Sequence, residues 1–107
     1  MTRLEKIARE LEFDIEDVQM LLSMFNENAQ ESLTQISTAI MHHDLPTIQN
    51  AAHAIKGSAA NLTLSEISEK AKEIEVSAKA GEERDYLELY QQLQSLIEEM
   101  DYDTLCA

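Results

Sequence analysis

Residues 14–41 read DIEDVQMLLSMFNENAQESLTQISTAIM, and the pattern of this run indicates the class of fold. Its apolar residues recur at intervals of three and four, which is the spacing of one face of an α-helix. Asp14 precedes the run, where a short polar side chain favours a helix start. The apolar positions are Ile15, Val18, Leu22, Phe25, Ala29, Leu33, Ile36 and Ile40. The run therefore predicts one long amphipathic helix.

Four further segments carry apolar residues at helical spacing. A short one lies over residues 4–11, before the long run, and Pro46 stands where the first turn of a later helix tolerates proline. Thr63 and Glu66 form a T-x-x-E pattern, which predicts a capping box for the helix after that. Gly81 is placed to end that helix. The apolar positions of the three later segments are Leu45, Ile48, Ala52, Ile55, Ala59 and Leu62, then Leu64, Ile67, Ala71, Ile74 and Ala78, and finally Tyr86, Tyr90, Leu93, Ile97 and Met100.

Length and composition agree with a helical protein. The chain has 107 residues with two glycines and one proline, which is too few for the frequent turns of a β-sandwich or barrel. The last helix is expected over about 85–100. Four long helices with short connections predict an all-α antiparallel up-down four-helix bundle with a short additional N-terminal helix. A single domain over residues 1–107 suits this length.

The net charge of the chain restricts the classes of partner that it can bind. Eight basic and 21 acidic side chains leave a net charge of -13, which argues against nucleic acid or an anionic membrane as partner. Residues 1–44 and 81–107 carry net charges of -6 and -7, whereas residues 45–80 carry four charges of each sign. We interpret the neutral 45–80 hairpin as the docking surface for a partner that presents acidic groups. The alternative is an acidic surface that only keeps the domain soluble.

Other features bear on compartment and cofactors. Cys106 is the single cysteine, so no internal disulfide forms, and no apolar run of transmembrane length or signal-peptide type occurs. We therefore expect a cytoplasmic protein. No glycine-rich phosphate loop is present, so the chain lacks an ATP site of its own. The adjacent His42 and His43 point about 100° apart on a helix and do not form a metal-ligand pair, and we expect no metal or cofactor.

The unusual segment is residues 52–62, AHAIKGSAANL. At 100° per residue, His53 falls outside the core face and Lys56 lies one turn along on the same flank. A neutral imidazole is a nucleophile near pH 7, and the Lys56 ammonium is placed to balance the charge of a phosphoryl group on it. Gly57 leaves no side chain beside the histidine, so the backbone of a partner can approach closely.

Three further positions complete the candidate site. Gln49 and Ala60 fall near His53 on the helical wheel, and with Gly57 we predict that they contact a partner. Glu75 lies at the core edge of the following helix, which runs antiparallel to the histidine helix. We expect its carboxylate to accept a hydrogen bond from the imidazole, which selects the tautomer and leaves the other nitrogen free to attack.

This segment, followed by Ile74 and Glu75, resembles the histidine phosphotransfer (HPt) domain of two-component phosphorelays, and the resemblance extends over nearly the whole chain. It implies a carrier and not an enzyme. In such a carrier, His53 accepts a phosphoryl group from a receiver-domain aspartate or a sensor kinase and passes it to a response regulator receiver. Lys56 occupies the assisting position of the family. Thr63 is a departure, because the family usually has glycine there.

The implied partners are response regulator receiver domains and hybrid sensor kinases, with Mg²⁺ on the receiver, and the carrier is expected to be a monomer. Two alternatives remain open. A helical adaptor would bind a partner through the 45–80 hairpin without chemistry. A kinase dimerisation hairpin also presents a histidine, but that class typically has an acid where Ala54 stands here.

Overall fold

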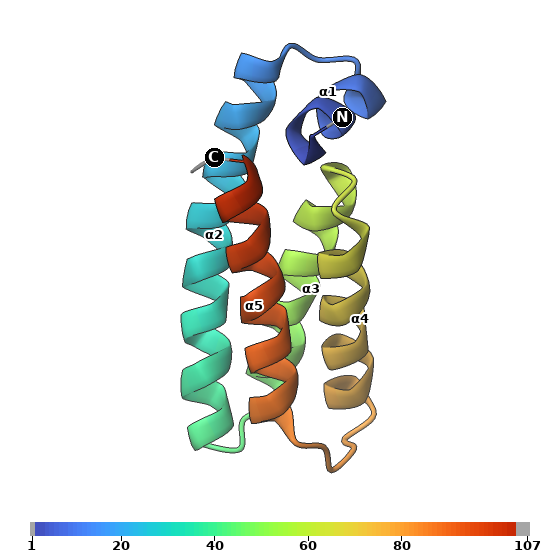
Figure 1. Cartoon of the computed structure of the whole chain (residues 1–107). Coiled ribbons are helices and arrows are strands. Elements are labelled where there is room, and N and C mark those ends of the chain that lie inside the picture. The colour runs from blue at the N-terminus through green and yellow to red at the C-terminus, as the bar shows by residue number, and fades with distance from the viewer. Residues whose placement is uncertain (1, 105–107) are drawn as a thin grey trace.

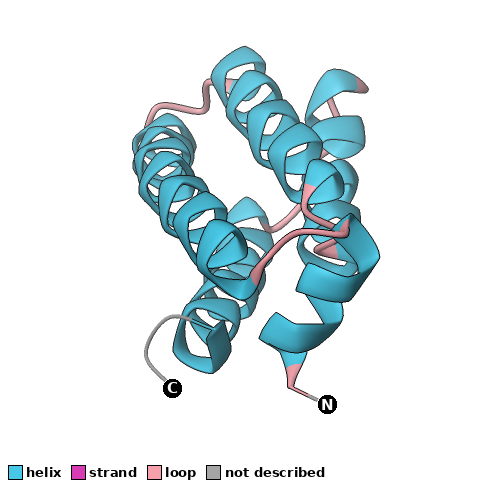
Figure 2. Cartoon of the chain, turned by 90° about the horizontal axis from the view of Figure 1, so that it is seen from above, coloured by secondary structure: helices cyan, strands magenta, loops and turns pink. Residues whose placement is uncertain are grey.

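The computed structural model describes residues 2–104, which form five α-helices and no strand (Figures 1 and 2). Cys106 lies outside the described residues. The helices are α1 (Arg3–Leu11), α2 (Ile15–Met41), α3 (Leu45–Asn61), α4 (Ser65–Lys79) and α5 (Tyr86–Thr104). The predicted all-α class is confirmed.

The four long helices form a closed ring of neighbours. Helix α2 packs against α3 and α5, and α4 packs against the same two helices, so each long helix touches the next one along the chain and α5 returns to α2. Helix α2 has 27 residues, which at 1.5 Å per residue span about 40 Å and account for the 41 Å long axis of the molecule. Helix α1 packs on α2 and α5 at one end (Figure 1). This is the predicted up-down bundle with an additional N-terminal helix.

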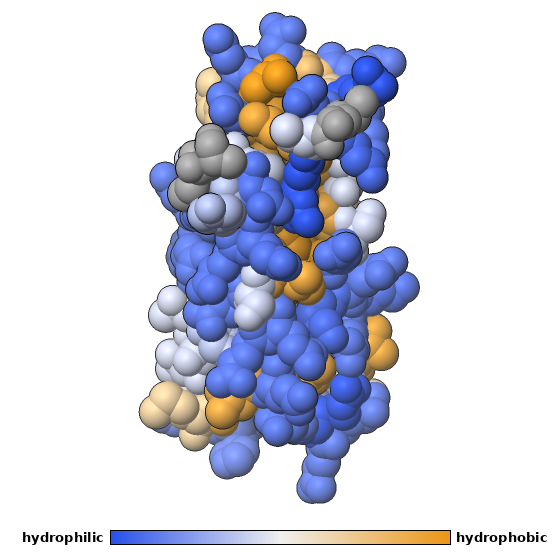
Figure 3. All heavy atoms as spheres, in the orientation of Figure 1, coloured by the Kyte–Doolittle hydropathy of each residue, from blue (hydrophilic) through white to orange (hydrophobic). Residues whose placement is uncertain are grey.

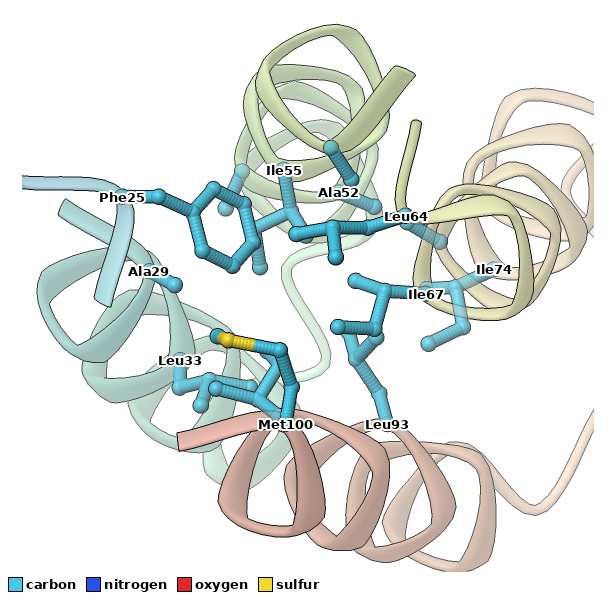
Figure 4. Close-up of a cluster of buried hydrophobic side chains, with 14 of the residues drawn as sticks. Phe25, Ala29, Leu33, Ala52, Ile55, Leu64, Ile67, Ile74, Leu93 and Met100 are labelled. Atoms are coloured by element: carbon cyan, nitrogen blue, oxygen red, sulfur yellow. The ribbon is translucent and has the colours of Figure 1, made fainter. Parts of the chain in front are cut away.

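The apolar stripes meet in one core (Figure 4). Leu22, Ile55, Ile74 and Leu93, one from each long helix, are each at most 2% exposed. Full burial of such a side chain contributes about 1.5–3 kcal/mol. Ile15 differs from the prediction and is 43% exposed, because it is the first residue of α2 and lies beyond the covered part of the stripe.

The outer surface is polar. The face in Figure 3, with α5 in front and α2 and α4 beside it, is mostly hydrophilic. Helix α5 is longer than predicted and continues past Met100 to Thr104. Thr104 is buried and its hydroxyl donates to the Met100 carbonyl oxygen at 2.6 Å, which holds the last turn in the helix.

The junction between α3 and α4 corrects one prediction. Thr63 does not form a capping box: its Oγ1 is buried and has no hydrogen-bond partner among the described residues, and the residue preceding α4 is Leu64. Thr63 instead follows Leu62, the C-cap of α3, with its N–H donating to the Ala60 carbonyl oxygen at 3.1 Å. Its φ of 59° is left-handed, a conformation that glycine adopts without steric cost.

The predictions for the other helix ends are confirmed in part. Asp14 precedes α2 as predicted, but its side chain makes no capping hydrogen bond. The cap of α3 is Asp44, whose carboxylate accepts from the Thr47 N–H at 3.2 Å, and Pro46 lies in the first turn. Gly81 follows α4 with a φ of 71°, as a C-terminal glycine is expected to do.

Candidate functional site

His53 lies on the outer side of α3. The apolar residues of this helix, among them Ile48, Ile55 and Ala59, are buried against the bundle. Since His53 lies about 140° around the helix from Ile48, it is outside the buried face, and its side chain is 66% exposed. The structure therefore places the imidazole in solvent, on the outer side of a helix, as the sequence predicts.

Glu75 reaches the imidazole from α4. Its Oε2 lies 2.5 Å from His53 Nδ1, and its side chain is only 13% exposed. An ionised carboxylate only accepts hydrogen bonds, so Nδ1 carries the proton in this pair. In the neutral ring the other nitrogen, Nε2, then has a free electron pair. The expected hydrogen bond between His53 and Glu75 is thus present.

Lys56 contacts the same carboxylate. Its Nζ donates to Glu75 Oε1 at 2.7 Å, and its side chain is 29% exposed. The hydrogen bond from Lys56 is the main cause that lowers the pKa of Glu75, the bond from His53 adds to it, and burial acts in the opposite direction. Glu75 is therefore ionised at neutral pH, and the Lys56 ammonium is bound to it, whereas the sequence suggested an ammonium aimed at a phosphoryl group.

Ser68 is a contact that the sequence did not reveal. Its hydroxyl, on α4, donates to the backbone carbonyl oxygen of Lys56 on α3 at 3.2 Å. Ser68 precedes Glu75 by seven residues, two helical turns, so the two lie on the same face of α4. The seven-residue spacing from Glu75 was the feature of the sequence from which a contact of Ser68 with α3 could have been predicted. The hydrogen bond joins α3 and α4 at the residue whose side chain holds Glu75.

The surface of α3 around His53 carries small side chains. Ala54, Gly57, Ser58 and Ala60 are all exposed, and Gln49 is half-buried. A Cβ on Gly57 would meet nothing within 4 Å, so packing within this chain does not require glycine there. A glycine inside a helix costs about 1 kcal/mol relative to alanine. The fold itself therefore gives no reason for the bare surface beside the histidine.

A second carboxylate cluster lies on another side of α4. Glu73 accepts from Lys70 Nζ at 2.9 Å and from Arg84 at 2.8 Å, and Arg84 also donates to Ser77 Oγ at 2.9 Å. The bonds from Lys70 and then Arg84 lower the pKa of Glu73. This cluster attaches the loop before α5 to α4.

The adjacent histidines His42 and His43 lie at the end of α2. His42 follows α2 and His43 has a left-handed φ of 53°, which is the polar helix end that the sequence indicates. Within residues 2–104, no group of three or more His, Cys, Asp or Glu side chains is arranged to hold a metal ion. None of the described helices has both the length and the apolar character needed to cross a lipid bilayer.

The fold and the site together define a helical bundle that presents one histidine, held by a carboxylate, to solvent. The Hpt domain family model matches residues 20–103, and the chain belongs to this family. Its fold is similar to the crystal structure of histidine-containing phosphotransfer protein B (HptB) from Pseudomonas aeruginosa PAO1. The TM-score is 0.75 at 24% identity, over 89% of this chain and 80% of that one. No curated protein sequence matches the chain.

Membership of the family settles the class of function. The protein is a phosphotransfer carrier of a phosphorelay and not a classical enzyme, and Hpt domains work with response regulators and kinases. The adaptor without chemistry is not favoured.

Proposed function

We propose that His53 is the residue of this carrier that is phosphorylated, and that Nε2 is the reacting nitrogen. The observation that carries the proposal is the hydrogen bond of Nδ1 to Glu75, on a side chain that is otherwise 66% exposed. This bond occupies one ring nitrogen and orients the ring. It leaves the electron pair of Nε2 available to a partner that approaches from solvent.

The transfer step follows from this arrangement. The electron pair of Nε2 attacks the phosphorus of an aspartyl phosphate on the receiver, the N–P bond forms, and the P–O bond to the aspartate breaks. The receiver carboxylate leaves with the bonding electrons, and Nδ1 keeps its proton. The positive charge that develops on the ring is stabilised by ionised Glu75. The reverse step delivers the phosphoryl group to the next receiver.

The partner supplies the remaining chemistry. Mg²⁺ held by the receiver would supply stabilisation of the charge on the transferring group, and on this proposal the carrier adds no cofactor and no ATP site. Gly57, Ala60 and Gln49 form the docking surface around His53, where small side chains allow close approach. The protein acts as a monomer in the cytoplasm, a compartment that suits a chain with a single cysteine.

The experiment is phosphoryl transfer from a receiver domain that carries a radiolabelled phosphoryl group. The wild-type protein is expected to take up acid-labile, base-stable label, and His53→Gln to take up none. His42→Gln, which changes an exposed histidine at the end of α2, is the matched control and is expected to keep the label. Retention of this label by His53→Gln contradicts the assignment. An adaptor without chemistry predicts no label on any variant.

A further inference from the structure

Building on the proposed role of His53, we infer that Lys56 is a positioning residue: it acts on the imidazole through Glu75 and not by contact with the phosphoryl group. The two oxygens of Glu75 have separate partners. Oε1 accepts from Lys56 Nζ at 2.7 Å and Oε2 lies against His53 Nδ1. The carboxylate thus joins the lysine to the histidine through separate oxygens.

The electrostatics of the site favour this role. The hydrogen bond from Lys56 is the largest cause of the lowered pKa of Glu75. An ionised carboxylate keeps the proton on Nδ1 and stabilises the positive ring during attack. Lys56 also holds this carboxylate in place before any partner arrives, because the 2.7 Å bond from its Nζ engages Oε1 while Oε2 meets the ring.

Turning Lys56 away from Glu75 would be costly. Glu75 is only 13% exposed, and it would lose the partner of one oxygen while negative charge arrives beside it. The backbone also opposes large movement of this residue, since Ser68 Oγ donates to the Lys56 carbonyl oxygen at 3.2 Å. The contacts of Glu75 and Ser68 therefore favour the Lys56–Glu75 ion pair that the structure shows.

A double-mutant cycle on the transfer rate separates the two routes. The variants are Lys56→Met, Glu75→Ala and the double variant, each tested with the same phosphorylated receiver domain. If Lys56 acts through Glu75, Lys56→Met slows transfer by about fivefold in the wild-type background and has no further effect once Glu75 is alanine. The same slowing in both backgrounds overturns the inference.

A second measurement uses the resting protein. Nitrogen-15 NMR of the His53 ring reports which nitrogen carries the proton, and Lys56→Met is expected to lower the population with the proton on Nδ1. A lysine that only meets the phosphoryl group leaves this spectrum unchanged, and that outcome contradicts the inference. Lys72→Met, which changes an exposed lysine on α4, is the matched control and is expected to leave both readouts unchanged.

The two proposals fail in different ways. Label that persists in His53→Gln removes the assignment of His53. Label that depends on His53, together with equal effects of Lys56→Met in both backgrounds, removes only the role of Lys56.

Discussion

Glu73 and Glu75 lie two residues apart on α4 and are similar in their number of hydrogen-bond partners and in the direction of their pKa shifts. Each carboxylate binds one partner per oxygen, and each has a pKa below its ordinary value because of those bonds. Residues two apart on a helix point about 200° away from each other, so the two carboxylates serve different flanks. Glu75 faces His53 and Lys56 on α3, whereas Glu73 faces Lys70 and Arg84.

The difference lies in the partners. Both partners of Glu73 are permanent cations, so its cluster is complete and has no reactive group to offer. Glu75 instead holds an imidazole on a side chain that is 66% exposed, and the other nitrogen of a neutral imidazole is a nucleophile. A lowered pKa therefore does not by itself mark a functional site. What distinguishes the site is an exposed nucleophile at one end of the hydrogen-bonded pair.

The largest expected effect tests this comparison directly. Glu75→Ala is expected to slow phosphoryl transfer to His53 by about 10- to 100-fold, because the ring loses its orienting bond and its counter-charge. Glu73→Ala is expected to leave the rate within about twofold of the wild type, a shift of less than about 0.5 kcal/mol. Rates from a phosphorylated receiver domain measure both. Equal rates in Glu75→Ala and the wild type would remove the orienting role.

A smaller effect tests how open the histidine flank is. Gly57→Phe is expected to reduce transfer by about tenfold, because the ring occupies the approach to His53. Gly57→Ala fits without a clash and is expected to raise the free energy of unfolding by about 0.5–1 kcal/mol. Urea denaturation and transfer rates check the two variants.

The control for this prediction lies on another helix. Ser95→Phe places the same bulk at an exposed position of α5, a helix that does not pack on α3. It is expected to leave transfer unchanged. A loss of transfer in Ser95→Phe that matches Gly57→Phe would mean that bulk anywhere on the surface disturbs the protein.

The smallest effect is one that the two carboxylates share. Their pKa values are lowered in the folded state, so each stabilises the fold at neutral pH, and this contribution is lost as the pH falls through the folded-state pKa. Glu73→Gln and Glu75→Gln are each expected to cost about 1 kcal/mol or less at neutral pH, and the cost is expected to shrink as the pH falls through the folded-state pKa. Urea denaturation over a series of acidic pH values measures this, and a cost that grows in acid would contradict it.

Most of the bundle was predictable because burial of apolar side chains follows helical periodicity. Val18, Leu22 and Ile36 recur at the spacing of one face and are fully buried. The same periodicity places His53 outside that face. The T-x-x-E pattern at Thr63 misled, because the backbone that ends α3 is left-handed at this residue and leaves no capping geometry for its hydroxyl.

The sequence by itself determined the helices, their buried faces and the exposure of the His53 imidazole. The spacing of apolar residues and the scarcity of glycine and proline were enough, because these features depend only on positions along one helix. The hydrogen-bond partner of the Lys56 ammonium could not be predicted in this way. A lysine side chain has several rotatable bonds and reaches in many directions, so its choice of Glu75 depends on how α4 is set against α3. That setting comes from the packing of the two helices and the Ser68 hydrogen bond, which exist only in the assembled bundle.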